Sequence, residues 1–318
     1  MNLLLKVWLL AWAARPVTPH PLHEGDGATL ENMWQHWEWR PAVILVLAVM
    51  AGTYGLGWWR LRRQGHRRLA SGWRLTAYLS GLAVLAAALL SAIDALQSLL
   101  FTMHMVQHEL LMMVAPPLLL LGDPFPIVLW VLPAGLRRTV GRLLTRGATF
   151  RRVLYRFTAP WVAWALYVAI LWIWHSPSAY DVALRNEVIH DLEHLSFFAA
   201  ALLFWWHVTA AAPHIHGSMG YGVRIGYVLA ALAQNEILAV SIALARQPLY
   251  TYYTTVPRLW GLSVLDDQKL GGAIMWIPGG MMYVLTAIIL LACLLDWEEK
   301  KTRREMSGDM HSLTHVVL

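Results

Sequence analysis

Seven apolar stretches run through the sequence, and they restrict the chain to one class of fold. A helix needs about 20 apolar residues to cross the roughly 30 Å hydrocarbon core of a bilayer. Hydrophobic residues make up 58% of the chain and charged residues only 14%, which is unlike a soluble globular protein. The sequence therefore predicts an all-α, polytopic membrane helical bundle with about seven transmembrane helices. The stretches cover residues 41–59, 73–93, 99–121, 159–174, 188–207, 225–244 and 273–295.

The lysines and arginines gather on alternate connections between these stretches. Connections on the cytoplasmic side of a membrane carry an excess of these residues, so the bias predicts an N-terminus outside the cytoplasm and a cytoplasmic C-terminus. Because the net charge of +6 arises from this clustering, no nucleic-acid partner is expected. The cytoplasmic set holds 18 of the 25 lysines and arginines, in residues 60–74 and 137–156, at Arg224 and in residues 300–304.

The remainder of the chain divides around a transmembrane domain of residues 41–296. Residues 1–14 are apolar and end in small residues, which indicates a signal peptide or an interfacial helix. Residues 15–40 are expected to form an extracytoplasmic segment, and residues 297–318 a cytoplasmic tail. The stretch 122–137 is apolar but holds three prolines, so it is expected to be interfacial or re-entrant rather than an eighth span.

Two His-x-x-x-His pairs lie inside apolar stretches: His104 with His108, and His190 with His194. Residues four apart share one face of a helix, so each pair can direct two imidazoles toward one point. Ionisable residues inside a membrane are costly and usually functional. The pairs therefore predict a buried metal or haem site.

The expected topology places two further candidates on the same side of the membrane as the pairs. His175 ends the fourth stretch, and Asp267 precedes the seventh. Glu109 and Glu193 each adjoin a pair, and they are candidates either for orienting the ligands or for joining them. The single cysteine, Cys293, excludes a disulfide within the chain and a thiolate cluster. A structural alternative, in which the buried rings only hydrogen-bond to neighbouring carboxylates, stays open.

Methionines near the first histidine pair bear on the choice of metal. Imidazole and thioether ligands together suit copper, especially Cu(I), whereas a carboxylate-rich set favours iron or manganese. Core packing explains these methionines equally well. The sequence predicts a copper ion as the cofactor, with candidate ligands His104, His108, His175, His190, His194, Asp267, Met103, Met105 and Met112.

Four motifs follow one another along most of the chain. They are MHMVQHELLMMVAPPLLLLGDP (103–124), WHSPSAYDVAL (174–184), HDLEHLSFFAAALLFWW (190–206) and DDQKLGGAIMWIPGG (266–280). Together they resemble the CtaG family of bacterial cytochrome c oxidase assembly factors, which is associated with caa3-type oxidases. Glu109 stands where this family is expected to have an aliphatic residue. The family's recurring polar positions fall here on His104, His108, His175, Asp181, His190, His194, Asp267 and Gln268.

The resemblance implies a multi-pass protein of the bacterial cytoplasmic membrane that is not an enzyme. Its implied role is in the assembly of haem-copper oxidase, by helping copper to reach the catalytic subunit of cytochrome c oxidase in the membrane. A soluble extracytoplasmic copper chaperone is a second expected partner, because the histidines are expected to face the outer side.

Three other functions fit the histidine spacing. A membrane di-iron oxygenase also uses repeated His-x-x-x-His motifs, although its histidines usually lie on the cytoplasmic side. A b-type cytochrome can bind haem through histidines of two facing helices. A copper importer requires polar residues through the whole bilayer, for which Glu236 and His207 are candidates.

Overall fold

A computed structural model describes residues 39–217 and 219–314, with side chains up to Glu305, and every regular element in these ranges is helical. The predicted all-α class is therefore confirmed. The predictions for residues 1–14 and for almost all of 15–40 lie outside the described residues. The elements are α2 (Pro41–Arg63), α3 (Gly72–Leu90), α4 (Ala92–Leu96), α5 (Phe101–Glu109), η2 (Leu110–Val114), α6 (Ala115–Leu121), α7 (Pro124–Leu129), α8 (Ala134–Leu143), α9 (Thr149–Phe157), α10 (Pro160–Trp174), α11 (Pro177–Arg185), α12 (Glu187–Thr209), α13 (Tyr221–Ala243), η3 (Thr251–Thr254), α14 (Val264–Ile274), η4 (Met275–Gly279) and α15 (Gly280–Thr314).

The described helices provide six or seven candidate membrane spans. Six are long and apolar enough by themselves, and α9 with α10 forms a seventh that bends by 48°. The last span starts at Val264, earlier than predicted, and its helix continues as far as Thr314. Residues 124–129 form only the short helix α7, as expected of a segment interrupted by prolines. The orientation of the chain across the membrane stays a prediction.

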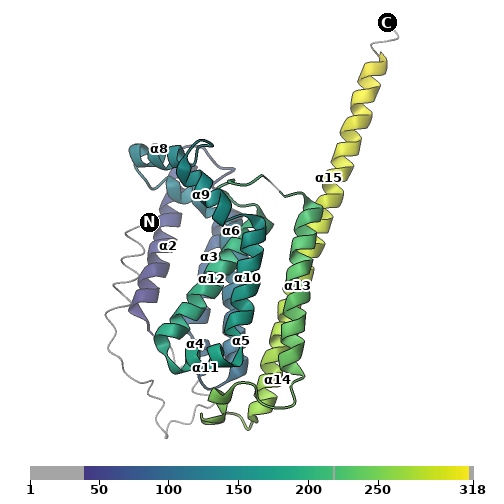
Figure 1. Cartoon of the computed structure of the whole chain (residues 1–318). Coiled ribbons are helices and arrows are strands. Elements are labelled where there is room, and N and C mark those ends of the chain that lie inside the picture. The colour runs from purple at the N-terminus through teal and green to yellow at the C-terminus, as the bar shows by residue number, and fades with distance from the viewer. Residues whose placement is uncertain (1–38, 218, 315–318) are drawn as a thin grey trace.

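The long helices stand side by side, and short elements close the two ends of the bundle (Figure 1). One end carries α4, α11 and α14, and we call it the α11 end. The opposite end carries α8 and α9, which hold six of the arginines in residues 137–156, and we call it the arginine-rich end. Under the predicted topology, the α11 end faces away from the cytoplasm.

The third span is interrupted directly after its histidine pair. Pro116 and Pro117 have no backbone N–H, so the carbonyl of Met112 has no helical donor four or five residues ahead. The indole Nε1–H of Trp205 on α12 donates to this carbonyl instead, at 2.8 Å. The chain forms one π-helical turn, η2, before α6 begins. This turn changes the helical register between the histidines and the rest of the span.

Candidate metal centre

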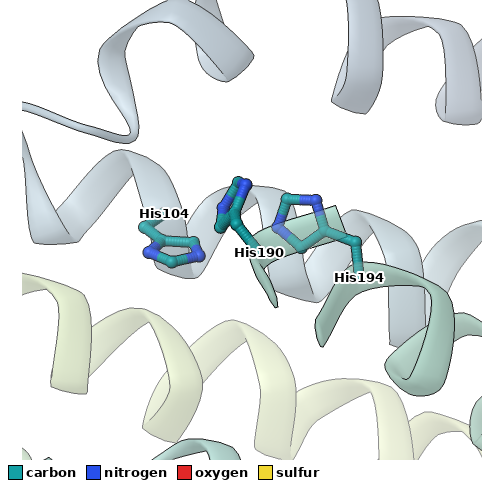
Figure 2. A group of neighbouring side chains, drawn as sticks. All are labelled: His104, His190 and His194. Atoms are coloured by element: carbon teal, nitrogen blue, oxygen red, sulfur yellow. The ribbon is translucent and has the colours of Figure 1, made fainter. Parts of the chain in front are cut away.

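Five histidines from three helices meet near the α11 end of the bundle. Helix α5 supplies His104 and His108, α12 supplies His190 and His194, and His175 follows the last residue of α10. All five are buried, with at most 6% of any of them exposed. Figure 2 shows the rings of His104, His190 and His194 side by side between the helices. The structure thus brings together both histidine pairs and His175, which we call the histidine cluster.

The rings lie within contact distance of one another across the helix interface. The centroids of His104 and His190 are 5.2 Å apart, and those of His108 and His194 are 5.4 Å apart. The ring of His175 lies 5.9 Å from that of His108. Because the histidines of each pair lie one helical turn apart on the same helix face, the rings of the two pairs meet edge-on between α5 and α12.

Two groups of side chains in the cluster have the spacing of metal ligands. One consists of His104, His190 and His194, and the other of His104, His108 and Glu193. Within each group, one ligand atom from every residue lies within 4.8 Å of the others. Nitrogen and oxygen ligands lie about 2 Å from a transition metal, so ligands on opposite sides of one ion are at most about 4 Å apart. A small contraction would therefore bring each group onto one ion.

The carboxylate of Glu193 and several ring nitrogens have no hydrogen-bond partner, although they are fully buried. Both oxygens of Glu193 are in this state, as are Nε2 of His104, both nitrogens of His108 and Nε2 of His194. Glu193 lies 3.7 Å from Nε2 of His108 and 3.9 Å from Nε2 of His104, which is too far for a hydrogen bond. Leaving buried polar atoms unsatisfied is costly. A cation bound between these side chains would coordinate the carboxylate and one nitrogen of each ring, and would thereby satisfy most of these atoms.

Hydrogen bonds behind His104 direct its Nε2 lone pair into the cluster. Tyr253 donates its hydroxyl hydrogen to the carbonyl of Gln97, at 2.8 Å, so its oxygen is free to accept from Tyr180, at 3.3 Å. The oxygen of Tyr180 in turn lies 2.6 Å from Nδ1 of His104 and can accept its hydrogen. Burial raises the pKa of both phenols well above its ordinary value, so both stay neutral. This chain favours the His104 tautomer that leaves Nε2 unprotonated.

His175 is oriented in a similar way by the backbone. Its Nδ1 lies 2.8 Å from the carbonyl of Leu171, one turn earlier on α10, and the hydrogen must therefore be on Nδ1. Nε2 then carries the lone pair, is buried and has no hydrogen-bond partner. Metal-binding histidines commonly donate their second ring N–H to a carbonyl or carboxylate in this manner.

We expect Tyr180→Phe to weaken Cu(I) binding by about 10- to 100-fold, because His104 loses the hydroxyl that sets its tautomer and orientation. Competition with a Cu(I) chelator measures the Kd. Tyr252→Phe is the matched control, since Tyr252 lies in η3 beside Tyr253 and packs edge-on against that ring rather than against a histidine. Equal Kd values for the two variants would contradict this assignment.

The structure does not bring Asp267 into the histidine cluster. Its carboxylate accepts hydrogen bonds from the backbone N–H groups of Phe101 and Thr102, at 2.9 and 3.0 Å, and from the Thr102 hydroxyl, at 2.7 Å. Arg258 pairs with it at 3.1 Å. Asp267 therefore binds the free amides at the start of α5, the helix that carries His104 and His108. Asp267 is therefore not one of the proposed ligands.

The three candidate methionines lie in three different environments. Met103 packs beside Leu96, Leu99 and Leu100, away from the cluster. Met105 is fully buried in the aromatic core with Phe101. Met112 lines a small cavity together with His108 and His175, so of these three candidates it is the one that shares a cavity with histidines of the cluster.

Sequence reasoning left the role of Glu193 open and did not select the tyrosines. Glu193 follows His190 by three residues and precedes His194, so all three lie on one face of α12, and this spacing is visible in the sequence. Tyr180 and Tyr253 gave no such signal because they lie on separate short helices. Of the remaining motif positions, Asp181 hydrogen-bonds Thr251 and the backbone of Tyr252, and so fastens the loop that carries Tyr253.

The chain is similar to three mycobacterial proteins. The chain is 27% identical over 293 residues to an uncharacterized protein of Mycobacterium bovis and, equally, to one of Mycobacterium tuberculosis. An uncharacterized protein of Mycobacterium leprae is 25% identical over 284 residues. These alignments cover 86–89% of this chain but only 41–42% of the relatives, so the chain spans less than half of their length. No solved structure matches.

The match to a protein family covers the whole region that holds the histidine cluster. The profile of the cytochrome c oxidase caa3 assembly factors matches residues 52–296, which include every residue of the histidine cluster. Because this match extends over most of the chain, the protein belongs to the CtaG family of caa3-type cytochrome c oxidase assembly factors.

Proposed function

We propose that this protein binds copper as Cu(I) in the histidine cluster and delivers it to the catalytic subunit of cytochrome c oxidase. The observation that carries the proposal is the set of buried ligand atoms that converge from α5 and α12, of which those of His104, His108, Glu193 and His194 have no hydrogen-bond partner. The family supplies the coarser part of the function, which is oxidase assembly. A transport step of this kind requires no catalysis, so we assign no enzymatic activity.

The charge of the cluster favours a monovalent ion. Among the described residues at the cluster, Glu193 is the carboxylate that faces the ring nitrogens, while the imidazoles are neutral ligands. Cu(I) with one carboxylate leaves no net charge in a buried site, whereas a divalent ion leaves one uncompensated positive charge. An uncompensated buried charge is expensive. Imidazole ligands are also well suited to copper.

The packing of the rings favours an ion over haem. Two axial histidines must stand on opposite faces of a porphyrin, which separates them by the macrocycle. Here the rings of α5 and α12 contact one another directly, and the ring of Phe197 packs 4.6 Å from that of His108. An absorption spectrum of the purified protein without a Soret band would agree with this assignment.

A cavity beside the cluster suggests how copper leaves. It has a volume of about 310 Å³ and lies between α2, α3, η2 and α12, with His194 and Arg40 in its wall. The buried residues of α2 are Tyr54, Gly57 and Leu61, so the first half of this helix is the less tightly packed. We place the exit between α2 and α12, which opens sideways toward a partner in the membrane. Under the predicted topology, a soluble chaperone loads the cluster from outside the cytoplasmic membrane.

Elemental analysis of protein purified without a histidine tag tests the proposal. After loading with Cu(I) and removal of excess metal, the wild type should retain copper. The variant H104A/H108A/H190A/H194A should bind it at least ~100-fold more weakly, since four ligands are lost. The control H66A/H214A removes two exposed histidines that lie outside the histidine cluster, and it should retain as much copper as the wild type. Equal copper in all three proteins would overturn the proposal.

A further inference from the structure

A second cluster of potential ligands lies beyond His108, toward the arginine-rich end. It surrounds a cavity of about 10 Å³, close to the space that one water molecule needs. We call this space the methionine cavity. Its wall includes three methionines, two histidines of the cluster and one carboxylate: Met112, Met113, Met275, His108, His175 and Glu109.

Two π-helical turns bring the three methionines to the cavity. Met112 and Met113 belong to η2, and Met275 is the first residue of η4, which contains Pro278. Such turns are rare and often occur at functional sites. The side-chain amide of Asn235 on α13 donates to the carbonyl of Met275, at 3.2 Å, and holds the second turn in place.

A glycine allows the carboxylate of Glu109 to reach this region. A Cβ atom at Gly279 would lie 2.7 Å from Oε1 of Glu109, which is closer than non-bonded atoms approach. Glu109 therefore occupies the space that a side chain at position 279 would take. Because Glu109 stands beside the cavity, a monovalent cation there has an anion to balance its charge.

The polar atoms at the cavity do not fit an ordinary apolar packing defect. His108 has no hydrogen-bond partner at either ring nitrogen, and His175 has none at Nε2. Methionine often fills irregular gaps in a core, and Met113 also accepts a hydrogen bond from Tyr167 at 3.3 Å. A thioether sulfur has a second lone pair, however, and thioethers with imidazoles form the ligand set that Cu(I) prefers.

We propose that the methionine cavity is a second Cu(I) position, bound by thioethers of Met112, Met113 and Met275 together with His108 or His175. This second position rests on the proposed function. It adds a sulfur-rich site about one helical turn, or ~6 Å, from the histidine cluster. His108 belongs to both positions, because its ring contacts His104 on one side and its side chain lines the cavity on the other. Copper passes between them by exchange of one ligand at a time, with no change in its oxidation state.

X-ray absorption at the copper edge of the full-length, Cu(I)-loaded protein tests the second position. The wild type should hold about two copper ions and show sulfur scattering. The variant M112L/M113L/M275L keeps the side-chain volumes nearly unchanged. It should hold about one copper ion with nitrogen and oxygen neighbours alone. M281L is the matched control, since Met281 is 65% exposed on α15, and it should behave as the wild type.

The outcomes separate this proposal from the one on which it rests. Copper without sulfur scattering in the wild type, lost in H190A/H194A, would overturn the second position and leave the histidine cluster intact. Sulfur scattering that survives in M112L/M113L/M275L would also overturn it. No bound copper in the wild type would overturn both. If the triple variant fails to fold, M275L alone should still lower the number of sulfur neighbours, and an unchanged number would count against the proposal.

Discussion

Cells that carry the variant H104A/H194A are expected to insert the polypeptides of cytochrome c oxidase into the membrane but to leave the catalytic subunit short of copper. The substitution removes one ligand from α5 and one from α12, so the group His104, His190 and His194 keeps a single histidine. We expect the oxidase activity per unit of haem to fall by ~10-fold or more. The copper content of the purified oxidase, measured beside its haem content, checks this result.

Two comparisons show whether this loss reflects copper supply. H214A removes an exposed histidine far from the cluster and should leave oxidase activity at the wild-type level. Excess copper in the growth medium should restore part of the activity in the H104A/H194A strain, because delivery is then less dependent on a high-affinity carrier. Full oxidase activity in the variant without added copper would exclude the histidine cluster from assembly.

The apolar stretches were sufficient to predict the helical class and the approximate number of spans. Length and hydropathy determine whether a helix can cross the bilayer, and both are properties of one segment. The breaks within spans were harder to locate. A π-helical turn after His108 depends on Pro116 and Pro117 but also on Trp205, which comes from another helix and accommodates the unpaired carbonyl. Such a partner is visible only after the helices have packed.

The histidine cluster could be predicted from spacing within single helices, whereas the sequence assigned Asp267 only a depth in the membrane. His-x-x-x-His spacing fixes both the depth and the face of each ring, because the two residues share a helix. Asp267 was selected because of its expected depth in the membrane alone, and this depth does not indicate which way the side chain points. In the structure its carboxylate points to the amides of Phe101 and Thr102. The spacing of Glu193 from His190 and His194 indicates both its depth in the membrane and the helix face on which it lies. Its carboxylate lies in the cluster.

Replacement of Asp94 by alanine is expected to lower the free energy of unfolding by several kcal/mol. Its side chain is fully buried, pairs with Arg40 at 2.8 Å and accepts from Gln107 at 2.7 Å. Removal of one partner from a buried ion pair typically costs about 3–5 kcal/mol, because the remaining charge is left without compensation. Asp191 also reaches Arg40, at 3.5 Å, so the lower part of this range is expected.

Thermal or denaturant unfolding in detergent measures this effect against an exposed pair. D296A breaks the contact between Asp296 and Lys300 on α15, where both side chains are at least 60% exposed, and should cost only ~0.3–0.5 kcal/mol.

The position of the Asp94 network means that D94A should also affect metal binding. Arg40 links Asp94, beside α5, to Asp191, which directly follows His190 on α12. D94A should therefore weaken Cu(I) binding as well. If D94A loses no more stability than D296A does, this network does not hold the two ligand helices together.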